Sequence, residues 1–163
     1  MHAPIPSSTE STRTLGVVRV LGAILLLFVG LDHYYEYSVD HYSVLPTIGT
    51  LFLLNFLSAA VVGVVLLVPL QRISPRFGRT ALQLAALSGL GIAATSLAAL
   101  LTSEQTTLFG FMESNYRPAI VIAIASEAAA TLCLAWLFAL TVRSGRAARR
   151  PRAGRHQPSA GTT

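Results

Sequence analysis

The sequence predicts an all-α, polytopic membrane protein with four transmembrane helices in an up-down bundle. Of its 163 residues, 53% are hydrophobic and only 12% are charged, whereas soluble domains carry about 25% charged residues. The apolar residues form four runs, each longer than the roughly 18–20 residues that cross a hydrocarbon core. These runs fill one domain, residues 14–142. The third observation is the uneven distribution of the arginines, which predicts the orientation.

The first helix is predicted over residues 15–37. A polar, proline-bearing segment, residues 1–13, precedes it, and disorder is expected there. The apolar stretch from Leu15 to Leu31 is longer than a signal-peptide core, and no small-residue cleavage pattern follows it. We therefore expect the first helix to remain as a membrane anchor.

The other three helices are predicted over residues 46–70, 80–102 and 118–142. Pro46 and Pro118 suit the first turns of the second and fourth helices, because the N–H that proline lacks would be unpaired there in any case. The segment between the second and third helices contains proline, glycine and three arginines, which favours a turn.

The arginines predict that both termini lie in the cytoplasm. All twelve basic residues are arginine, and all but Arg117 fall on the side of the two termini and the second connection. Cytoplasmic segments retain such an excess of positive charge. The basic tail, residues 143–163, is expected to be disordered and to contact anionic lipid headgroups. The lysine-free, alanine- and arginine-rich composition suggests a GC-rich bacterial genome, and hence the bacterial plasma membrane.

Glu127 is predicted to lie near the middle of the fourth helix, on a face with small residues at every fourth position. Charged side chains at this depth usually face the bundle interior. An intramembrane polar layer is predicted from residues at similar depth: Asn55, Thr95, Ser96, Ser126 and Glu127. Two interpretations remain open. A protonated Glu127 fastens two helices through Asn55, or Glu127 handles protons in a small proton-coupled transporter.

Two Asp-His-Tyr triplets surround the end of the first helix. They supply the candidates for a ligand or metal site at the outer face, which are Asp32, His33, Asp40 and His41. Haem, copper or zinc would be the groups bound. The spacing of the histidines crosses an expected loop and fixes no geometry, so no cofactor is predicted and the metal interpretation stays an alternative.

Aromatic residues gather on the same outer side. We expect an aromatic roof over the bundle, formed by Tyr34, Tyr35, Tyr42, Phe109, Phe111 and Tyr116. A roof above a polar layer could enclose a lipid or a quinone, and a run such as that around Phe109 suits the membrane interface.

The stretch YSVLPTIGTLFLLNFLSA carries a resemblance. A histidine near the end of a first membrane helix, then a tyrosine, then P-T-I-G-x-L-F-L-L-N resembles a family of uncharacterised actinobacterial four-helix integral membrane proteins. The matching residues are His33, Tyr42, Pro46, Thr47, Ile48, Gly49, Leu51, Phe52, Leu53, Leu54 and Asn55. The resemblance implies a four-helix fold and no particular activity.

The function predicted from these features is that of a small, non-enzymatic accessory or assembly subunit of the membrane. No nucleophile–base pair, phosphate loop or carboxylate cluster is recognisable, and nothing marks a nucleic-acid partner. A haem-, metal- or quinone-binding redox subunit and a proton-coupled transporter remain as alternatives. Lipid is the expected partner, together with further copies of the chain or a larger membrane complex.

Overall fold

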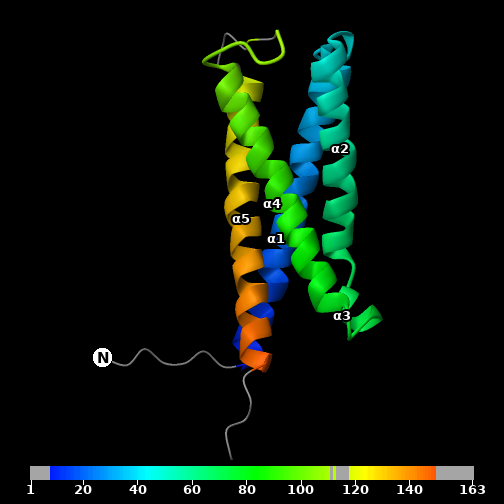
Figure 1. Cartoon of the computed structure of the whole chain (residues 1–163), viewed down its shortest axis with the longest axis vertical. Coiled ribbons are helices and arrows are strands. Elements are labelled where there is room, and N and C mark those ends of the chain that lie inside the picture. The colour runs from blue at the N-terminus through cyan, green and yellow to red at the C-terminus, as the bar shows by residue number, and fades with distance from the viewer. Residues whose placement is uncertain (1–7, 111, 113–117, 150–163) are drawn as a thin grey trace, which may run out of the picture.

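The computed structural model describes residues 8–110, 112 and 118–149 and shows an all-α chain whose four long helices pack as an up-down bundle (Figure 1). The long helices are α1 (Ser8–Ser38), α2 (Pro46–Leu67), α4 (Gly78–Ser103) and α5 (Pro118–Arg149). Two short helices lie in the connections, the 3-10 helix η1 (Tyr42–Val44) and α3 (Leu70–Ile73). The predicted fold class is confirmed.

Each long helix contains a segment long and apolar enough to cross a membrane: Thr12–Ser38, Pro46–Leu67, Gly78–Ser103 and Pro118–Gly145. Only 17% of the residues in the most apolar window of Pro46–Leu67 are buried inside the bundle. Most apolar side chains of the helix are therefore exposed or partly exposed, which suits a lipid solvent and would promote aggregation in water. The chain is a four-span helical membrane protein.

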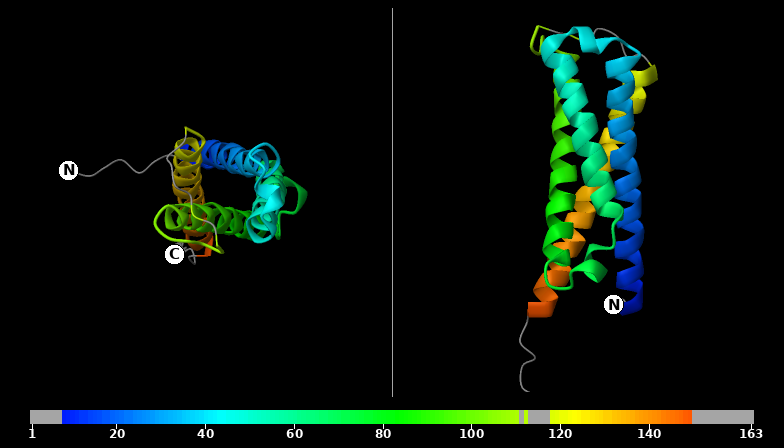
Figure 2. Two further views of the ribbon diagram at one scale, coloured as in Figure 1. Left: turned by 90° about the horizontal axis from the view of Figure 1, so that it is seen from above. Right: turned by 90° about the vertical axis from the view of Figure 1, so that its right-hand side faces the viewer.

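Viewed along the bundle, the four long helices are tilted and outline a rough square (Figure 2). α1 packs against α2 and α5, and α4 packs against α5 and α2, while α1 and α4 barely touch across the diagonal. We call the end of the bundle that carries η1 the η1 end. The opposite end, where α1 begins, α3 lies and α5 finishes, is the terminal end (Figure 1).

The helix ends differ from the expected ones at the start of α1, at the end of α5 and at the end of α2, which was predicted to reach Leu70. α1 begins at Ser8 and α5 continues to Arg149, so helix extends into both segments for which disorder was expected. Glu10 lies in the first turn of α1, where a negative charge interacts favourably with the helix dipole. α2 ends at Leu67 because Pro69 forces the preceding Val68 into an extended conformation, with φ −67° and ψ 133°.

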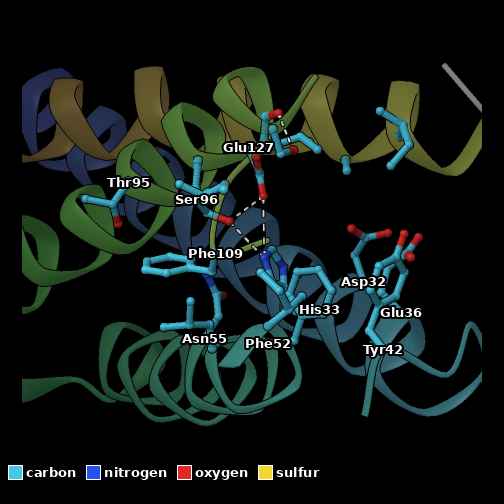
Figure 3. Close-up of a pocket in the computed structure, with 18 residues that line it drawn as sticks. Asp32, His33, Glu36, Tyr42, Phe52, Asn55, Thr95, Ser96, Phe109 and Glu127 are labelled. Atoms are coloured by element: carbon cyan, nitrogen blue, oxygen red, sulfur yellow. Dashed lines mark hydrogen bonds and ion pairs between the residues drawn. The ribbon is translucent and has the colours of Figure 1, made fainter. Parts of the chain in front are cut away.

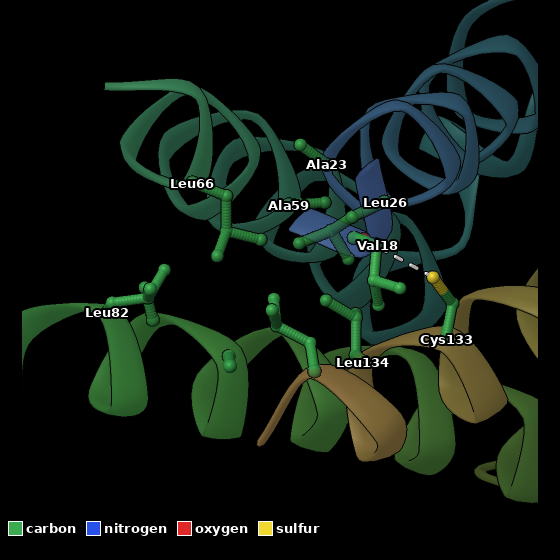
Figure 4. Close-up of a cluster of buried hydrophobic side chains, with 11 residues drawn as sticks. Val18, Ala23, Leu26, Ala59, Leu66, Leu82, Cys133 and Leu134 are labelled. Carbon is green, nitrogen blue, oxygen red and sulfur yellow. Dashed lines mark hydrogen bonds between the residues drawn. The ribbon is translucent and has the colours of Figure 1, made fainter. Parts of the chain in front are cut away.

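The apolar core fills the half of the bundle nearer the terminal end. Leu26, Leu66, Leu82, Leu134 and Leu137 are fully buried there, with small alanines between them (Figure 4). Alternating large and small side chains let the four helices interdigitate closely. The half nearer the η1 end is built differently: polar side chains and a cavity take the place of the leucines.

Candidate functional site

His33 is held by hydrogen bonding and by aromatic packing. The residue is 7% exposed, and its Nδ1 donates to the carbonyl oxygen of Val29, one helical turn earlier, at 2.9 Å. A carbonyl oxygen can only accept, so Nδ1 carries a proton. Phe52 of α2 packs edge-on against the imidazole at 5.2 Å between ring centroids, and Tyr42 packs edge-on against Phe52 at 5.1 Å. The other ring nitrogen, Nε2, is thereby directed away from α2.

Nε2 of His33 meets two side chains from α4 and α5. Ser96 Oγ lies 2.8 Å from Nε2 and 2.7 Å from Oε1 of Glu127, and Nε2 lies 3.7 Å from the same Oε1 (Figure 3). Glu127 is 1% exposed. We call these three residues, which come from three different helices, the His–Ser–Glu trio.

The short contacts in the trio determine how many protons it holds. Two hydrogen bonds join three heavy atoms, and each requires one proton. The Ser96 hydroxyl supplies one, so the second belongs either to Nε2, as imidazolium, or to Glu127, as carboxylic acid. Either arrangement gives the trio no net charge, and moving protons through the Ser96 hydroxyl interconverts them.

A cavity of about 340 Å³ adjoins the trio. Its walls are mostly apolar, with polar groups set among them, which is how small-molecule sites are usually built. The lining residues are Asp32, His33, Glu36, Tyr42, Ile48, Leu51, Phe52, Asn55, Thr95, Ser96, Ala99, Leu100, Ser103, Leu108, Phe109, Ile120, Ala123 and Glu127. All four long helices and both connections at the η1 end contribute.

Oε2 of Glu127 and Oδ1 of Asn55 are buried beside the cavity and have no hydrogen-bond partner within the described part of the chain. Buried polar atoms are rarely left unpaired, because the lost hydrogen bond costs about 1–3 kcal/mol. Their position at the cavity wall therefore indicates that something other than protein completes their hydrogen bonding.

The predicted polar layer is partly brought together. Asn55, Thr95, Ser96 and Glu127 all line the cavity, whereas Ser126 is not among the lining residues. Ser126 donates to the carbonyl of Ala123 in its own helix, and Thr95 likewise bonds to carbonyls of α4. The partner of Glu127 is Ser96, with His33 beyond it, and Asn55 Oδ1 makes no hydrogen bond to any residue that the structure describes.

The four outer-face candidates are separated by the fold. His33 and Asp32 line the cavity, but His41 and Asp40 do not. His41 is exposed in the connection and adopts a left-handed backbone conformation with φ 61°. Among the described residues, no group of three or more His, Cys, Asp and Glu side chains is arranged to hold a metal ion.

Two members of the expected aromatic roof, Tyr42 and Phe109, line the cavity. Tyr34 and Tyr35 are 42% and 49% exposed, and Tyr34 packs against Phe56 on the outer surface of α2. Phe111 and Tyr116 lie outside the described residues. Phe109 has φ 54°, a conformation that is strained for an aromatic residue, at the mouth of the cavity.

Sequence reasoning missed the contact between His33 and Glu127. Counting residues from the helix ends placed His33 near the surface and Glu127 near the midplane, which assumes parallel helices. α5 instead runs obliquely across the bundle (Figure 2). The sequence also gave no indication of the apolar cavity wall, which includes Phe52, Ala99 and Ala123. The available signal was the lone intramembrane acid, which needed a partner somewhere in the bundle.

The fold and the cavity together define a small multi-pass α-helical membrane protein with a ligand-sized site between its helices. Comparison with family models, curated proteins and solved structures finds no match to this chain.

Proposed function

We propose that this chain is a non-enzymatic membrane protein that binds one small amphipathic molecule in the cavity beside the His–Ser–Glu trio. The apolar walls would hold the body of the molecule, and the trio with Asn55 would hold its polar head. One observation carries the proposal: two unpaired buried oxygens, Glu127 Oε2 and Asn55 Oδ1, border a cavity of about 340 Å³. That volume lies within the range of small-molecule pockets, roughly 300–1,000 Å³.

A purely structural role for the polar layer accounts less well for this geometry. Polar groups that only fasten helices satisfy one another, and small residues then close the space between the helices. Here α1 and α2 do approach closely at Gly30, where an added Cβ would lie 3.0 Å from the Cβ of Ala59. The bundle nevertheless remains open at the level of Glu127. This contrast supports ligand binding over a role limited to assembly.

The serine, histidine and glutamate do not form a nucleophilic triad. In such a triad an acid orients the histidine through Nδ1 and leaves Nε2 to take the serine proton. In this chain Nδ1 bonds to the Val29 carbonyl, and Glu127 competes with Nε2 for the serine hydroxyl. Ser96 also lies inside α4, where the backbone N–H groups are engaged in helical bonds and cannot form an oxyanion hole.

We further propose that the cavity opens toward the extracytoplasmic side of a bacterial plasma membrane. The arginines at the terminal end, among them Arg72, Arg76 and Arg79, support this orientation through the positive-inside rule. The η1 end would then face outward. The ligand would reach the trio from that side or from the outer lipid leaflet.

A blocking substitution tests the proposed function. Ala99 lines the cavity and has an exposed side chain, so Ala99→Trp should fill the space with little change in helix packing. Ala98 is its matched control, because it is exposed on the same helix but does not line the cavity. Neopentylbenzene, a small apolar probe, should bind wild type and Ala98→Trp in lipid nanodiscs but not Ala99→Trp. Equal binding to all three chains would overturn the proposal.

A further inference from the structure

Apart from His33 and Tyr42, the ionisable side chains that line the cavity are carboxylic acids. Asp32 and Glu36 come from α1 and Glu127 from α5, and no arginine lines it within the described part of the chain. Asp32 and Glu127 come from different helices and line the same cavity. Asp32 has no ion-pair partner among the described residues. Phe52, Phe109 and Tyr42 add aromatic rings to the same walls.

This combination is complementary to a particular class of molecule. Carboxylates attract a positive charge, aromatic faces attract cations by a further electrostatic interaction, and the apolar walls require an apolar body. We propose that the ligand is a small lipophilic organic cation, and that the cavity exchanges it for the one proton that the His–Ser–Glu trio holds. The inference rests on the proposed function and assigns the class of its ligand.

The exchange follows from the proton count. A neutral His33 beside an ionised Glu127 would carry one negative charge. In the observed geometry the trio holds one additional proton, so its net charge is zero. Loss of that proton leaves one negative charge at a site where Glu127 is 1% exposed. An unpaired charge at membrane depth is costly. Either the proton or another cation must therefore accompany Glu127.

The other groups around the trio are acidic or neutral. The ionisable groups facing it are Asp32 and Glu36 on α1 and Tyr42 in η1. α2 and α4 line the cavity with neutral side chains only, including Asn55, Ser96 and Ser103. Oε2 of Glu127, which has no hydrogen-bond partner among the described residues, is the oxygen available to an incoming cation. When the cation arrives, the proton would pass from the trio to water through the cavity.

The test compares two probes of the same shape. Benzyltrimethylammonium carries a fixed positive charge, and neopentylbenzene is its neutral isostere. Calorimetry on the full chain in nanodiscs, repeated in buffers of different ionisation enthalpy, counts the protons released on binding. We expect the cation to release close to one proton. Its affinity should fall about tenfold for each pH unit of acidification in the range where the trio is protonated, because proton and cation compete for one site.

Glu127→Gln keeps the shape of the side chain and removes its charge. It should reduce benzyltrimethylammonium binding at least tenfold and abolish proton release. Asp32→Asn should weaken cation binding less and preserve proton release. Glu104→Gln is the control, because Glu104 does not line the cavity and its substitution should change neither measurement.

The outcomes separate the two proposals. Binding of neopentylbenzene without binding of the cation would overturn the cation assignment and leave the proposed function in place. Cation binding without proton release would overturn the exchange. Failure of both probes to bind would count against the proposed function itself.

Discussion

Nε2 of His33 lies 3.7 Å from Oε1 of Glu127, and the hydroxyl of Ser96 bonds to both atoms. This contact joins α1, α4 and α5 at one point in the half of the bundle that lacks the leucine core. Hydrogen bonds between membrane helices contribute modestly, on the order of 0.6 kcal/mol each and up to about 2. The same three side chains therefore stabilise the η1 half of the bundle and form the polar wall of the cavity.

Ser96→Ala should destabilise the bundle. The substitution removes the bridging hydroxyl and leaves Nε2 of His33 and Oε1 of Glu127 at 3.7 Å, too far apart for a good direct hydrogen bond. Two buried polar groups lose a partner, so we expect the free energy of unfolding to fall by about 1–3 kcal/mol. Thermal unfolding in detergent, followed by circular dichroism, measures the change.

Ser88→Ala is the matched control for this substitution. Ser88 is exposed on α4 and does not line the cavity, so its loss should change stability by less than about 0.5 kcal/mol. If the two alanine variants unfolded at the same temperature, the bridge through Ser96 would have no energetic role.

Glu127→Gln and Glu127→Ala should separate hydrogen bonding from charge. The amide of glutamine can donate to Ser96 Oγ while Ser96 donates to Nε2, which reproduces the arrangement with a protonated acid. We expect Glu127→Gln to unfold within about 1 kcal/mol of wild type. Glu127→Ala leaves the trio incomplete and should cost about 1–3 kcal/mol or more. A Gln variant as unstable as the Ala variant would show that the trio needs a negative charge.

Much of the fold could be predicted from the sequence because lipid imposes a simple rule. Apolar runs of sufficient length must become helices that span, since no water is present to pair with the backbone. Pro46 and Pro118 mark two helix starts correctly. Composition says less about where a span ends, because a helix can continue into polar residues once its first turns are fixed. α5 does so, reaching Arg149.

The site was less predictable because it depends on helix rotation and tilt. Glu127 could be identified as inward-facing from the small residues on its helix face, and Ser96 from its depth. His33 could not be paired with them, because its sequence neighbourhood is rich in polar and aromatic residues typical of the membrane interface. A helix face is a local property of the sequence, whereas the contact between α1 and α5 depends on the packing of the whole bundle.

Gly30→Val should loosen the site without touching it. A Cβ at Gly30 would lie 3.0 Å from the Cβ of Ala59 and 3.4 Å from the carbonyl oxygen of Phe56. The larger valine side chain would push α1 away from α2, and overpacking of this kind costs about 1–3 kcal/mol. His33 lies one turn further along α1, so the trio should shift with it. Thermal unfolding and probe binding should both report the change.

Gly16→Val is the control for Gly30→Val on the same helix. A Cβ at Gly16 would meet nothing within 4 Å, so valine there should be neutral or slightly stabilising through its higher helix propensity. Probe binding should be unchanged. A loss of binding in the Gly16 variant would mean that α1 responds to substitutions at any position, and the close contact between α1 and α2 would not be the cause.

The orientation can be tested with single cysteines. Cys133 is 8% exposed in the core, so Cys133→Ala should give a cysteine-free background at a small cost in stability. Ser43 in η1 and Gln71 in α3 are both exposed and lie at opposite ends of the bundle. With the arginine-rich terminal end in the cytoplasm, a membrane-impermeant thiol reagent should label Ser43→Cys on intact cells. It should label Gln71→Cys only after lysis. The reverse pattern would place the mouth of the cavity in the cytoplasm, and any cation would then have to enter from inside the cell.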